Sequence, residues 1–252
     1  MKVSALRRLV EHGLFLAVFL GAWEWAAGAG RLNPTFFGRP TGVLLYAWKN
    51  LALGGALWVD LGWTVGGVLL SFALGALAAV AVGLAFVTWP RLEAFADPYF
   101  TALNAMPRLA LAPLFILWFG LGLGSKVAIG FSLTFFIVLA NTVAGIRGVN
   151  PDHVTLCRTL GATPRQLFML VTLPGAVPVI FSGLRLGLIF AMLGVVGGEI
   201  IAAERGLGQK IAYLGSTFDI NGVMALLLLM SLLGVAATGI MTWLEKRLIA
   251  WQ

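Results

Sequence analysis

The chain has 252 residues, of which 60% are hydrophobic and 11% are charged, and its formal net charge is +7. A soluble domain of this size carries roughly 25% charged residues, so too few polar groups are present here to cover a water-facing surface. We therefore expect the bilayer to be the solvent, and we exclude nucleic-acid binding because the basic residues are scattered between apolar stretches and form no basic face.

Cysteine and histidine are scarce. Cys157 is the only cysteine, which excludes an intramolecular disulfide and argues against a cysteine-based metal site. His12 and His153 are isolated, so we expect no metal ion. The first apolar run continues through Trp23 and Trp25 without a small-x-small cleavage site before them, and we expect no cleavable signal peptide.

Six stretches have about the 20 mostly apolar residues that a helix needs to cross the hydrocarbon core. They comprise residues 9–29, 61–90, 94–120, 127–146, 175–201 and 222–244. Between the first two, residues 40–53 are typical of a short helix that begins at a proline and lies along the outer interface of the membrane, since it is too short to cross. We predict an all-α integral membrane protein with six transmembrane helices and both termini on one side.

Basic residues in the predicted loops indicate the orientation, because cytoplasmic loops carry an excess of lysine and arginine. One side of the membrane holds Lys2, Arg7, Arg8, Arg91, Arg147, Arg158, Arg165, Lys246 and Arg247. The other side holds Arg31, Arg39, Lys49, Lys126, Arg205 and Lys210. This bias predicts cytoplasmic termini and a cytoplasmic loop at residues 150–174. Six tryptophans near span ends are typical of an aromatic belt: Trp58, Trp63, Trp89, Trp118, Trp243 and Trp251.

The polar segment at residues 150–174 is built like a soluble helix–turn–helix between apolar spans. Asn150 is a good N-cap and Pro151 a good first helical residue. Gly161 stands where a helix C-terminus favours a left-handed residue. Thr163, followed by a proline and by a glutamine at the third helical position, predicts a second helix start with a capping box. We expect two helices at a sharp turn that present a surface to a cytoplasmic partner; the alternative is an ordinary helical loop.

Two arginines lie well inside predicted spans, where a charge is costly unless it faces water or a partner. Arg108 and Arg185 could line a pathway for anions. The alternative is that each pairs with a carboxylate or with a helix-end carbonyl. Pro107 and Pro113 break the third span, and broken helices commonly flank translocation routes. Glu199 is a candidate for an outer gate, with a solvated helix end as its alternative.

The second predicted span carries a row of small residues at every fourth position. These are Gly67, Ser71, Gly75, Ala79 and Gly83. Such spacing lets helix backbones approach closely. The row therefore predicts a helix face that packs against protein and not lipid, either as a seam that slides or pivots during transport or as static helix packing.

The hairpin sequence LCRTLGATPRQLFMLVTLP resembles the EAA loop of ABC-importer permeases, in which EAA is followed by a glycine and by I-x-L-P. Gly161 matches the glycine, and Leu173 and Pro174 match the L-P. Four further segments, LNAMPRLALAPLFILWFGLG, NTVAGIRGVNP, SGLRLGL and ERGLGQKI, are similar to the nitrate/sulfonate/taurine branch of that superfamily. The resemblance departs at Thr155, which stands in place of the motif's glutamate, so the acidic contact of that side chain is not carried over.

The resemblance implies a type I ABC importer permease fold, with a coupling helix that inserts into a separate ATPase subunit. By this match the coupling residues are Asn150, Pro151, Asp152, Thr155, Leu156, Cys157, Arg158, Leu160, Gly161 and Ala162. It also implies a bacterial cytoplasmic (inner) membrane, two ATPase copies, a periplasmic or lipid-anchored solute-binding protein, and a second permease copy, most simply a homodimer. We expect no enzymatic activity and no cofactor in this chain, because it lacks a G-x-x-x-x-G-K-[ST] motif; ATP and Mg are expected on the partner ATPase.

We expect residues 1–57 to form an N-terminal span with the outer interfacial helix, and residues 58–252 to form a permease core of five spans and the coupling loop. The resemblance implies transport of a small organic or inorganic anion of the sulfonate, taurine or nitrate kind. The alternative substrate is a pyrimidine-type vitamin precursor or an aromatic acid. An ion-driven secondary transporter is a rival class, but it tends to show paired repeats with broken helices, and only one broken span is found. An integral-membrane enzyme would need a polar catalytic cluster, and none is visible.

Overall fold

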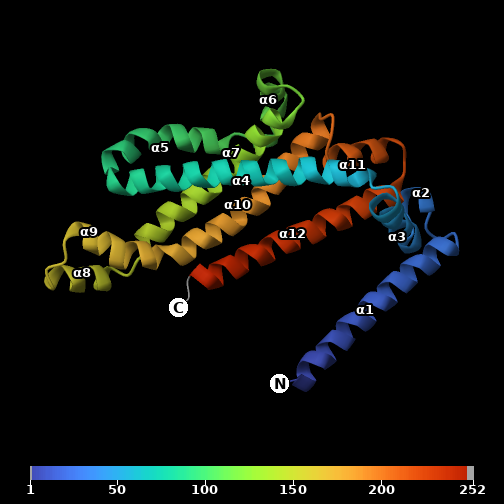
Figure 1. Ribbon diagram of the computed structural model, residues 1–252, viewed down its shortest axis with the longest axis horizontal. Coiled ribbons are helices and arrows are strands. Elements are labelled where there is room, and N and C mark those ends of the chain that lie inside the picture. The colour runs from blue at the N-terminus through green and yellow to red at the C-terminus, as the bar shows by residue number, and fades with distance from the viewer. Residues whose placement is uncertain (1, 249–252) are drawn as a thin grey trace. The chain divides into compact units, whose positions relative to one another are not determined.

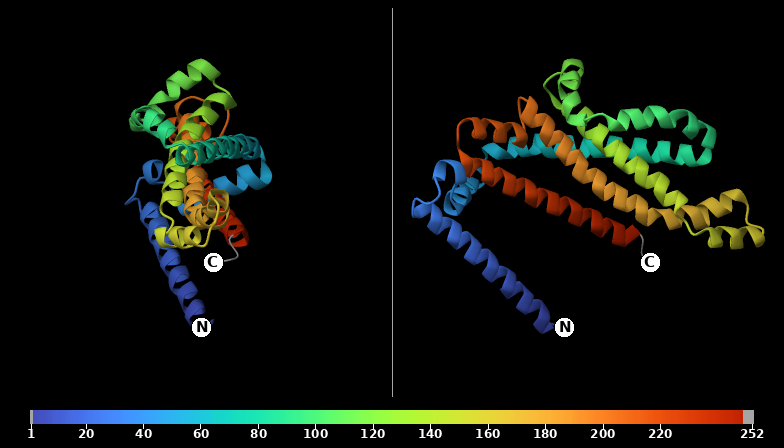
Figure 2. Two further views of the ribbon diagram at one scale, coloured as in Figure 1. Left: turned by 90° about the vertical axis from the view of Figure 1, so that its left-hand side faces the viewer. Right: turned by 180° about the vertical axis from the view of Figure 1, so that it is seen from behind.

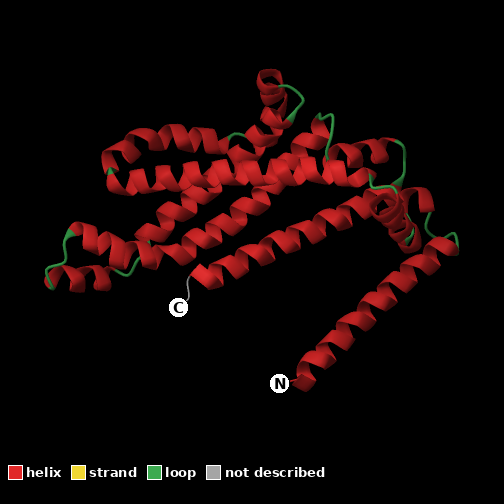
Figure 3. Ribbon diagram, in the orientation of Figure 1, coloured by secondary structure: helices red, strands yellow, loops and turns green. Residues whose placement is uncertain are grey.

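The computed structural model describes residues 2–248, with side chains at positions 7, 8, 10–55 and 57–248. Almost all of these residues are helical, and no strand occurs among them (Figure 3). The prediction of an all-α protein is thereby confirmed for this part of the chain. Trp251 of the predicted aromatic belt and the side chain of Lys2 lie outside the described residues.

Contacts within the chain divide it into two compact units. Unit 1 comprises Met1–Asp60 and Lys210–Ser231, and unit 2 comprises Leu61–Gln209 and Leu232–Gln252. Three helices have residues in both units: α4 (Ala56–Thr88), α11 (Leu207–Ser216) and α12 (Ile220–Leu248). The predicted domain border between residues 57 and 58 stays a prediction.

Unit 1 begins with the long helix α1 (Lys2–Gly28), followed by α2 (Pro34–Phe37), α3 (Pro40–Trp48) and a π-helical turn, η1 (Lys49–Leu53). The short helix α3 begins at a proline, as its sequence predicts. The Glu24 carboxylate of α1 accepts hydrogen bonds from the backbone N–H and the hydroxyl of Thr41, at 3.1 and 3.0 Å. Asn221 of α12 accepts a further bond from the N–H of Arg39 at 2.8 Å. Polar contacts from two long helices therefore fix the start of α3.

Unit 2 holds the elements between residues 61 and 209. They are α5 (Pro90–Ala105), the 3-10 turn η2 (Arg108–Leu111), α6 (Ala112–Phe119), α7 (Leu123–Arg147), α8 (Pro151–Thr159), α9 (Pro164–Leu167), the π-helical turn η3 (Phe168–Thr172) and α10 (Leu173–Ile201). Helix α7 packs along α10 (Figure 1). Glycines make the approach possible, because the Cα atom of Gly130 lies only 2.8 Å from the point that a Cβ atom at Gly194 would occupy.

The buried apolar core of unit 2 lies where α4, α5, α7 and α10 meet. One cluster consists of Ala79, Phe86, Ala96, Val138 and Leu139, and a second consists of Ile146, Ala176 and Ile180. The ring of Phe100 meets the ring of Phe86 with centroids 5.3 Å apart. These contacts pack α7 and α10 against α4, which is the second predicted span.

Within the described residues, four helices are long and apolar enough to cross a membrane. They cover Leu57–Thr88, Leu123–Arg147, Pro164–Ile201 and Ile220–Leu248. The pair Pro90–Ala105 and Arg108–Phe119 passes the same test as a broken span, bent by 85° where the sequence places Pro107. Helix α1 covers the first predicted span, residues 9–29, but is not among these candidates, so the count of six stays a prediction with which the structure is compatible.

The third of these helices is unusually long. It joins α9, η3 and α10 into one helix of 38 residues. At 1.5 Å per residue such a helix is about 57 Å long, whereas the hydrocarbon core is about 30 Å thick. The α8–α9 hairpin lies at the N-terminal end of α10 in every view (Figure 2). The length of the helix leaves room for this hairpin outside the hydrocarbon.

Candidate functional site

The segment at residues 150–174 folds into two short helices at a sharp turn. The Asn150 side chain caps α8 by accepting a hydrogen bond from the N–H of Asp152 at 2.9 Å. Gly161 has a φ of 84°, in the left-handed region that favours glycine. Thr163 and Gln166 form the capping box of α9. Both predicted helix starts and the predicted turn are confirmed.

The hairpin leads directly into α10 through the π-helical turn η3. Pro174 has no N–H to donate to the carbonyl one turn before it, and the backbone next to it widens into the π form. Such turns occur frequently at functional sites. No loop separates the hairpin from α10, so a movement of the hairpin passes directly to that helix.

Helix α8 exposes two large apolar side chains on one side. Leu156 is 58% exposed and Leu160, one turn later, is 78% exposed. The Thr155 hydroxyl donates to the carbonyl of Pro151 at 2.9 Å, and the side chain of Cys157 is half-buried. Leucines four residues apart on a short helix form a typical anchor for a groove on another protein.

Arg108 lies in η2, at the break in the third predicted span, and is only 9% exposed. Its guanidinium donates to the carbonyls of Ser132 at 2.9 Å and Met106 at 3.3 Å, and to the side chain of Asn104 at 3.1 Å. It also lies 4.0 Å from the centroid of the Phe136 ring. Protein groups therefore satisfy this cation, the arrangement that its structural alternative predicts. A role in an anion pathway stays a prediction.

Arg185 lies in α10 and forms an ion pair with Glu245 of α12. Both side chains are partly buried, with 35% and 22% of their surfaces exposed. The Nε atom of Arg185 is buried without a hydrogen-bond partner among the described residues. The structural alternative for Arg185, a pair with a carboxylate, is the arrangement found, although the sequence did not identify Glu245, which is 60 residues away.

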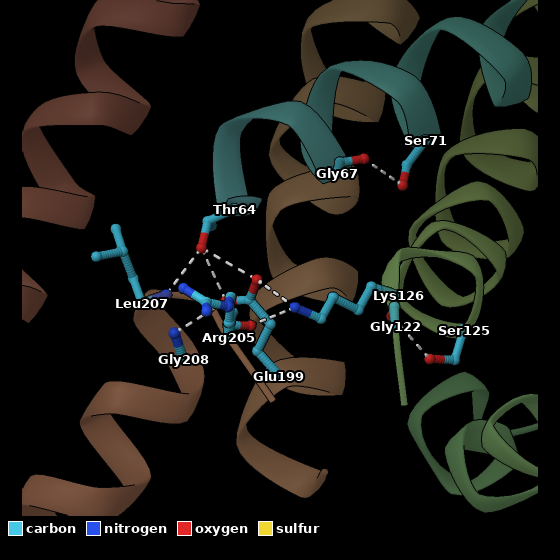
Figure 4. A network of polar contacts seen from close by, with 10 residues as sticks. All are labelled: Thr64, Gly67, Ser71, Gly122, Ser125, Lys126, Glu199, Arg205, Leu207 and Gly208. Atoms are coloured by element: carbon cyan, nitrogen blue, oxygen red, sulfur yellow. Dashed lines mark hydrogen bonds and ion pairs between the residues drawn. The ribbon is translucent and has the colours of Figure 1, made fainter. Parts of the chain in front are cut away.

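Glu199 stands at the centre of a buried polar network (Figure 4). Its carboxylate lies 3.3 Å from the ammonium of Lys126 and 2.9 Å from the hydroxyl of Thr64. The N–H of Gly208 donates to the same carboxylate at 2.9 Å. Glu199 and Lys126 are each only 1% exposed. The alternative of a solvated helix end is therefore wrong for Glu199, because its carboxylate is buried among neighbouring elements, and a role in an outer gate stays a prediction.

The same network holds the connection between α10 and α11. Lys126 also donates to the carbonyl of Arg205, and the hydroxyl of Thr64 accepts from the N–H of Leu207 at 2.8 Å. Gly206 has a φ of 125°, and a Cβ atom there would overlap the carboxylate of Glu199. The network therefore joins the beginning of α4, the beginning of α7, the end of α10 and the beginning of α11.

Sequence reasoning missed Lys126 and Thr64 as partners of Glu199. Lys126 was assigned to a loop, because it directly precedes an apolar run. One signal could have found the pair: consecutive spans are antiparallel, so the beginning of α7 and the end of α10 reach the same level. Opposite charges at these two ends are typical of an ion pair.

The residues predicted for a translocation pathway do not come together in one site. Pro107 caps η2, Arg108 contacts α5 and α7, Arg185 contacts α12, and Glu199 contacts Lys126. Within residues 2–248, no group of three or more His, Cys, Asp and Glu side chains can hold a metal ion. The polar groups inside the spans therefore bind mostly to one another.

The row of small residues on α4 is buried along its whole length. A Cβ atom at Gly75 would lie 2.8 Å from the Thr134 side chain, and one at Gly83 would lie 2.8 Å from Thr142. Both threonines belong to α7. The row therefore faces a neighbouring helix at close range. A sliding or pivoting role stays a prediction.

Comparison with protein-family models identifies one family that this chain matches. The model described as the binding-protein-dependent transport system inner membrane component matches residues 71–250. This range contains the hairpin, the helix pair α7 and α10, and all of Lys126, Arg185 and Glu199.

Several relatives match nearly the whole chain. The formylaminopyrimidine transport permease protein ThiX of Halalkalibacterium halodurans is 31% identical over 96% of this chain and 96% of that protein. The putative aliphatic sulfonates transport permease protein SsuC of Bacillus subtilis is 33% identical over 95% of this chain and 87% of that protein. The taurine transport system permease protein TauC of Escherichia coli is 30% identical over 94% of this chain and 88% of that protein.

Solved structures share the fold at lower identity. An inward-facing structure of the MetNI methionine ABC transporter matches with a TM-score of 0.64 and 19% identity, over 77% of this chain and 94% of that chain. An amino acid ABC transporter crystallised with histidines matches with a TM-score of 0.62 and 16% identity, over 78% of this chain and 96% of that chain. These likenesses show that the chain has the fold of membrane subunits of such transporters.

Proposed function

Because the chain belongs to the family of binding-protein-dependent transport system inner membrane components, we propose that it forms the gated path by which an ATP-driven ABC importer takes up a small organic or inorganic anion. The predicted family and the predicted importer-permease fold are confirmed. As a permease the chain is not an enzyme, and ATP hydrolysis lies in a separate subunit. A solute-binding protein delivers the substrate to the permease.

The observation that carries the mechanism is the continuity of the helix Pro164–Ile201. Its N-terminal end begins in the hairpin, and its C-terminal end carries Glu199 in the buried network. A short capped hairpin is stiff, so an ATPase that moves it displaces α10 as a rigid rod. The coupling contact is proposed to lie on α8, with Leu156 and Leu160 as its apolar anchors and with the capping residues holding the helix in shape. ATP and Mg are bound by the partner.

Site-directed crosslinking tests which partner the hairpin touches. In a Cys157→Ser background, Leu160→Cys places a thiol on an exposed position of α8, and Glu204→Cys places one on the exposed connection after α10. We expect a crosslinker on Leu160→Cys to capture the ATPase, and one on Glu204→Cys to capture the solute-binding protein. Capture of the solute-binding protein from Leu160→Cys would contradict both the orientation and the coupling role.

The substrate class is proposed from relatives. Two of them are named for aliphatic sulfonates and taurine, which share an anionic sulfonate group. A specific observation favours the alternative of a pyrimidine-type precursor: Arg108 and Arg185 are already engaged by protein groups, and a relative of similar identity is named for formylaminopyrimidine. Identification of the ligand bound to the cognate solute-binding protein decides between them.

Substitution of the two arginines tests the anion pathway separately. If Arg108 and Arg185 attract an anion, Arg→Gln lowers uptake while the complex still assembles with normal thermal stability. If they serve packing, the same changes reduce yield and thermal stability first, and this is the outcome that their contacts favour. Normal uptake together with normal stability for both variants would contradict both accounts.

The assembly is proposed to contain two permease copies and two ATPase copies in a bacterial cytoplasmic membrane, with both permease termini in the cytoplasm. The small number of spans per chain supports two permease copies, because so few helices are too small a set to enclose a gated path. The mass of the detergent-purified assembly should correspond to two copies of each subunit. An active complex with one permease copy would contradict the proposal.

A further inference from the structure

A cavity of about 800 Å³ lies between the end of α4 and the α8–α9 hairpin. Its lining includes Val87, Thr88, Arg158, Leu167, Phe168 and Thr172. Binding pockets for small ligands typically have volumes of about 300–1,000 Å³. The cavity is therefore large enough to hold a ligand, and neither of the apolar anchors proposed above, Leu156 and Leu160, lines it.

The lining of this cavity is amphipathic. Val87, Leu167 and Phe168 give it apolar walls, and its polar lining residues are Thr88, Thr172 and Arg158. A guanidinium with its fork of N–H donors suits phosphate oxygens better than any other side chain does. The apolar walls suit hydrocarbon. A molecule that carries both an anionic phosphate and an acyl chain would satisfy the whole lining.

The cavity lies at the membrane boundary. The apolar span of α4 ends at Thr88, which is one of the lining residues. Trp89 follows it and is 61% exposed, and Arg91 is exposed two residues later. Tryptophan and arginine at a span end are typical of the lipid headgroup region. The excess length of the helix Pro164–Ile201 places its first turns, including Phe168 and Thr172, at the same boundary.

Arg158 points away from the proposed ATPase contact. It is two residues from Leu156, which is about 200° around a helix axis, so it lies on the opposite side of α8 from that leucine. Its side chain is exposed and forms no ion pair among the described residues. One side of α8 thus carries apolar anchors, and the other side presents a cation to the cavity.

We propose that this cavity binds an anionic phospholipid, with the Arg158 guanidinium on its phosphate group and an acyl chain along Val87 and Phe168. Basic pockets next to transmembrane helices on the cytoplasmic side are typical sites for anionic headgroups. The bound lipid would contact both the hairpin and the end of α4 and so stabilise their relative position. The inference rests on the cytoplasmic placement of the hairpin that is part of the proposed function, but not on the identity of the transported solute.

Native mass spectrometry of the purified permease–ATPase complex, delipidated and titrated with defined lipids, tests the site. The probes are phosphatidylglycerol, neutral phosphatidylcholine and inorganic phosphate. We expect phosphatidylglycerol to bind the unmodified complex about fivefold more tightly than phosphatidylcholine, the ratio that one arginine near the surface supplies. Arg158→Gln should remove this preference, and Arg158→Lys should keep part of it.

Arg165→Gln is the matched control, because it removes the same charge from the same hairpin at an exposed position that does not line the cavity. It should leave the preference unchanged. An equal loss in both variants would show diffuse attraction of lipid to a basic loop and would overturn the proposal. Arg158-dependent binding of inorganic phosphate without binding of phosphatidylglycerol would also overturn it. So would loss of the ATPase from Arg158→Gln with lipid preference unchanged, since a protein partner would then occupy the cavity.

Discussion

The two ends of α10 show opposite ways of placing polar groups in a membrane protein. At its N-terminal end, the hairpin is exposed and holds its shape through caps that join residues two or three positions apart, such as Asn150 with Asp152. At its C-terminal end, Glu199 is buried and contacts Lys126, 73 residues away, and Thr64, 135 residues away. The hairpin can move as a unit without losing its capping hydrogen bonds. The buried network must break contacts between helices in order to move.

The contrast between the two ends indicates which of them is held in place by its contacts. Removing one partner of a buried ion pair leaves an uncompensated charge, so such a pair tolerates little displacement. A capped hairpin keeps its own hydrogen bonds in any orientation. If the hairpin couples to the ATPase as proposed, the buried network is the fixed end of α10, and the hairpin is the end that receives the movement.

The largest expected effect comes from breaking the network at its centre. Glu199→Ala should lower the free energy of unfolding by about 3–5 kcal/mol, because Lys126 is left buried without its counter-ion. Thermal unfolding of the purified complex measures this loss. The double variant Glu199→Leu with Lys126→Met should recover most of it, since no isolated charge remains.

An exposed ion pair provides the control for this prediction. Arg147 pairs with Glu93, and their side chains are 56% and 19% exposed. Glu93→Ala should change stability by about 0–1 kcal/mol, as expected for a pair near water. Equal losses from Glu199→Ala and Glu93→Ala would show that burial does not distinguish the network.

A smaller effect is expected from adding one methyl group at each end of the helix. Gly206→Ala should cost more than the about 1–2 kcal/mol of left-handed strain, because the new Cβ atom would displace the Glu199 carboxylate. Gly161→Ala should cost the strain alone, since nothing lies within 4 Å of a Cβ atom there. Thermal unfolding of the two variants under the same conditions gives the comparison. A larger loss at Gly161 would reverse the assignment of the fixed end.

The contrast between the two ends also explains what the sequence could predict. The caps around Asn150, Gly161 and Thr163 depend on neighbours within a few residues, so the sequence displays them directly and the structure confirms them. The apolar spans are equally local. The row from Gly67 to Gly83 was visible for the same reason, because it repeats at the period of one helix face.

The buried network could not be predicted in the same way. Its members come from four helices, and a lysine before an apolar run looks like a loop residue until the packing is known. Lys126 and Glu199 meet only because α7 and α10 run antiparallel at glycine-lined contacts such as Gly130 with Gly194. Tertiary packing, which composition and spacing do not reveal, therefore decides whether a charge near a span end is solvated or buried.

A change in the orientation of the hairpin should impair coupling to the ATPase without impairing folding of the spans. Gly161→Val adds a β-branched side chain where φ is 84°, at a strain of about 1–2 kcal/mol. The permease should still insert, because Gly161 lies outside the apolar spans and a Cβ atom there has nothing within 4 Å. Association with the ATPase should weaken, or hydrolysis should stop responding to the loaded solute-binding protein, and uptake should fall. Normal substrate uptake by this variant, measured with vesicles, would show that the orientation of the hairpin does not affect transport.

The smallest effect is expected at the position where the family motif has a glutamate. The Thr155 hydroxyl donates to the carbonyl of Pro151, one turn earlier on the same helix, and such back-bonds contribute little to stability. Thr155→Ala should therefore change the free energy of unfolding by no more than about 0.5 kcal/mol, as for other exposed positions. Affinity for the ATPase should be unchanged, because the hydroxyl is turned toward its own helix and no ion pair is lost. A binding titration with purified ATPase checks this, with Leu160→Ala as the variant expected to weaken binding. If Thr155→Ala weakens binding as much as Leu160→Ala does, the threonine contacts the partner, and the apolar anchors are not the centre of the interface.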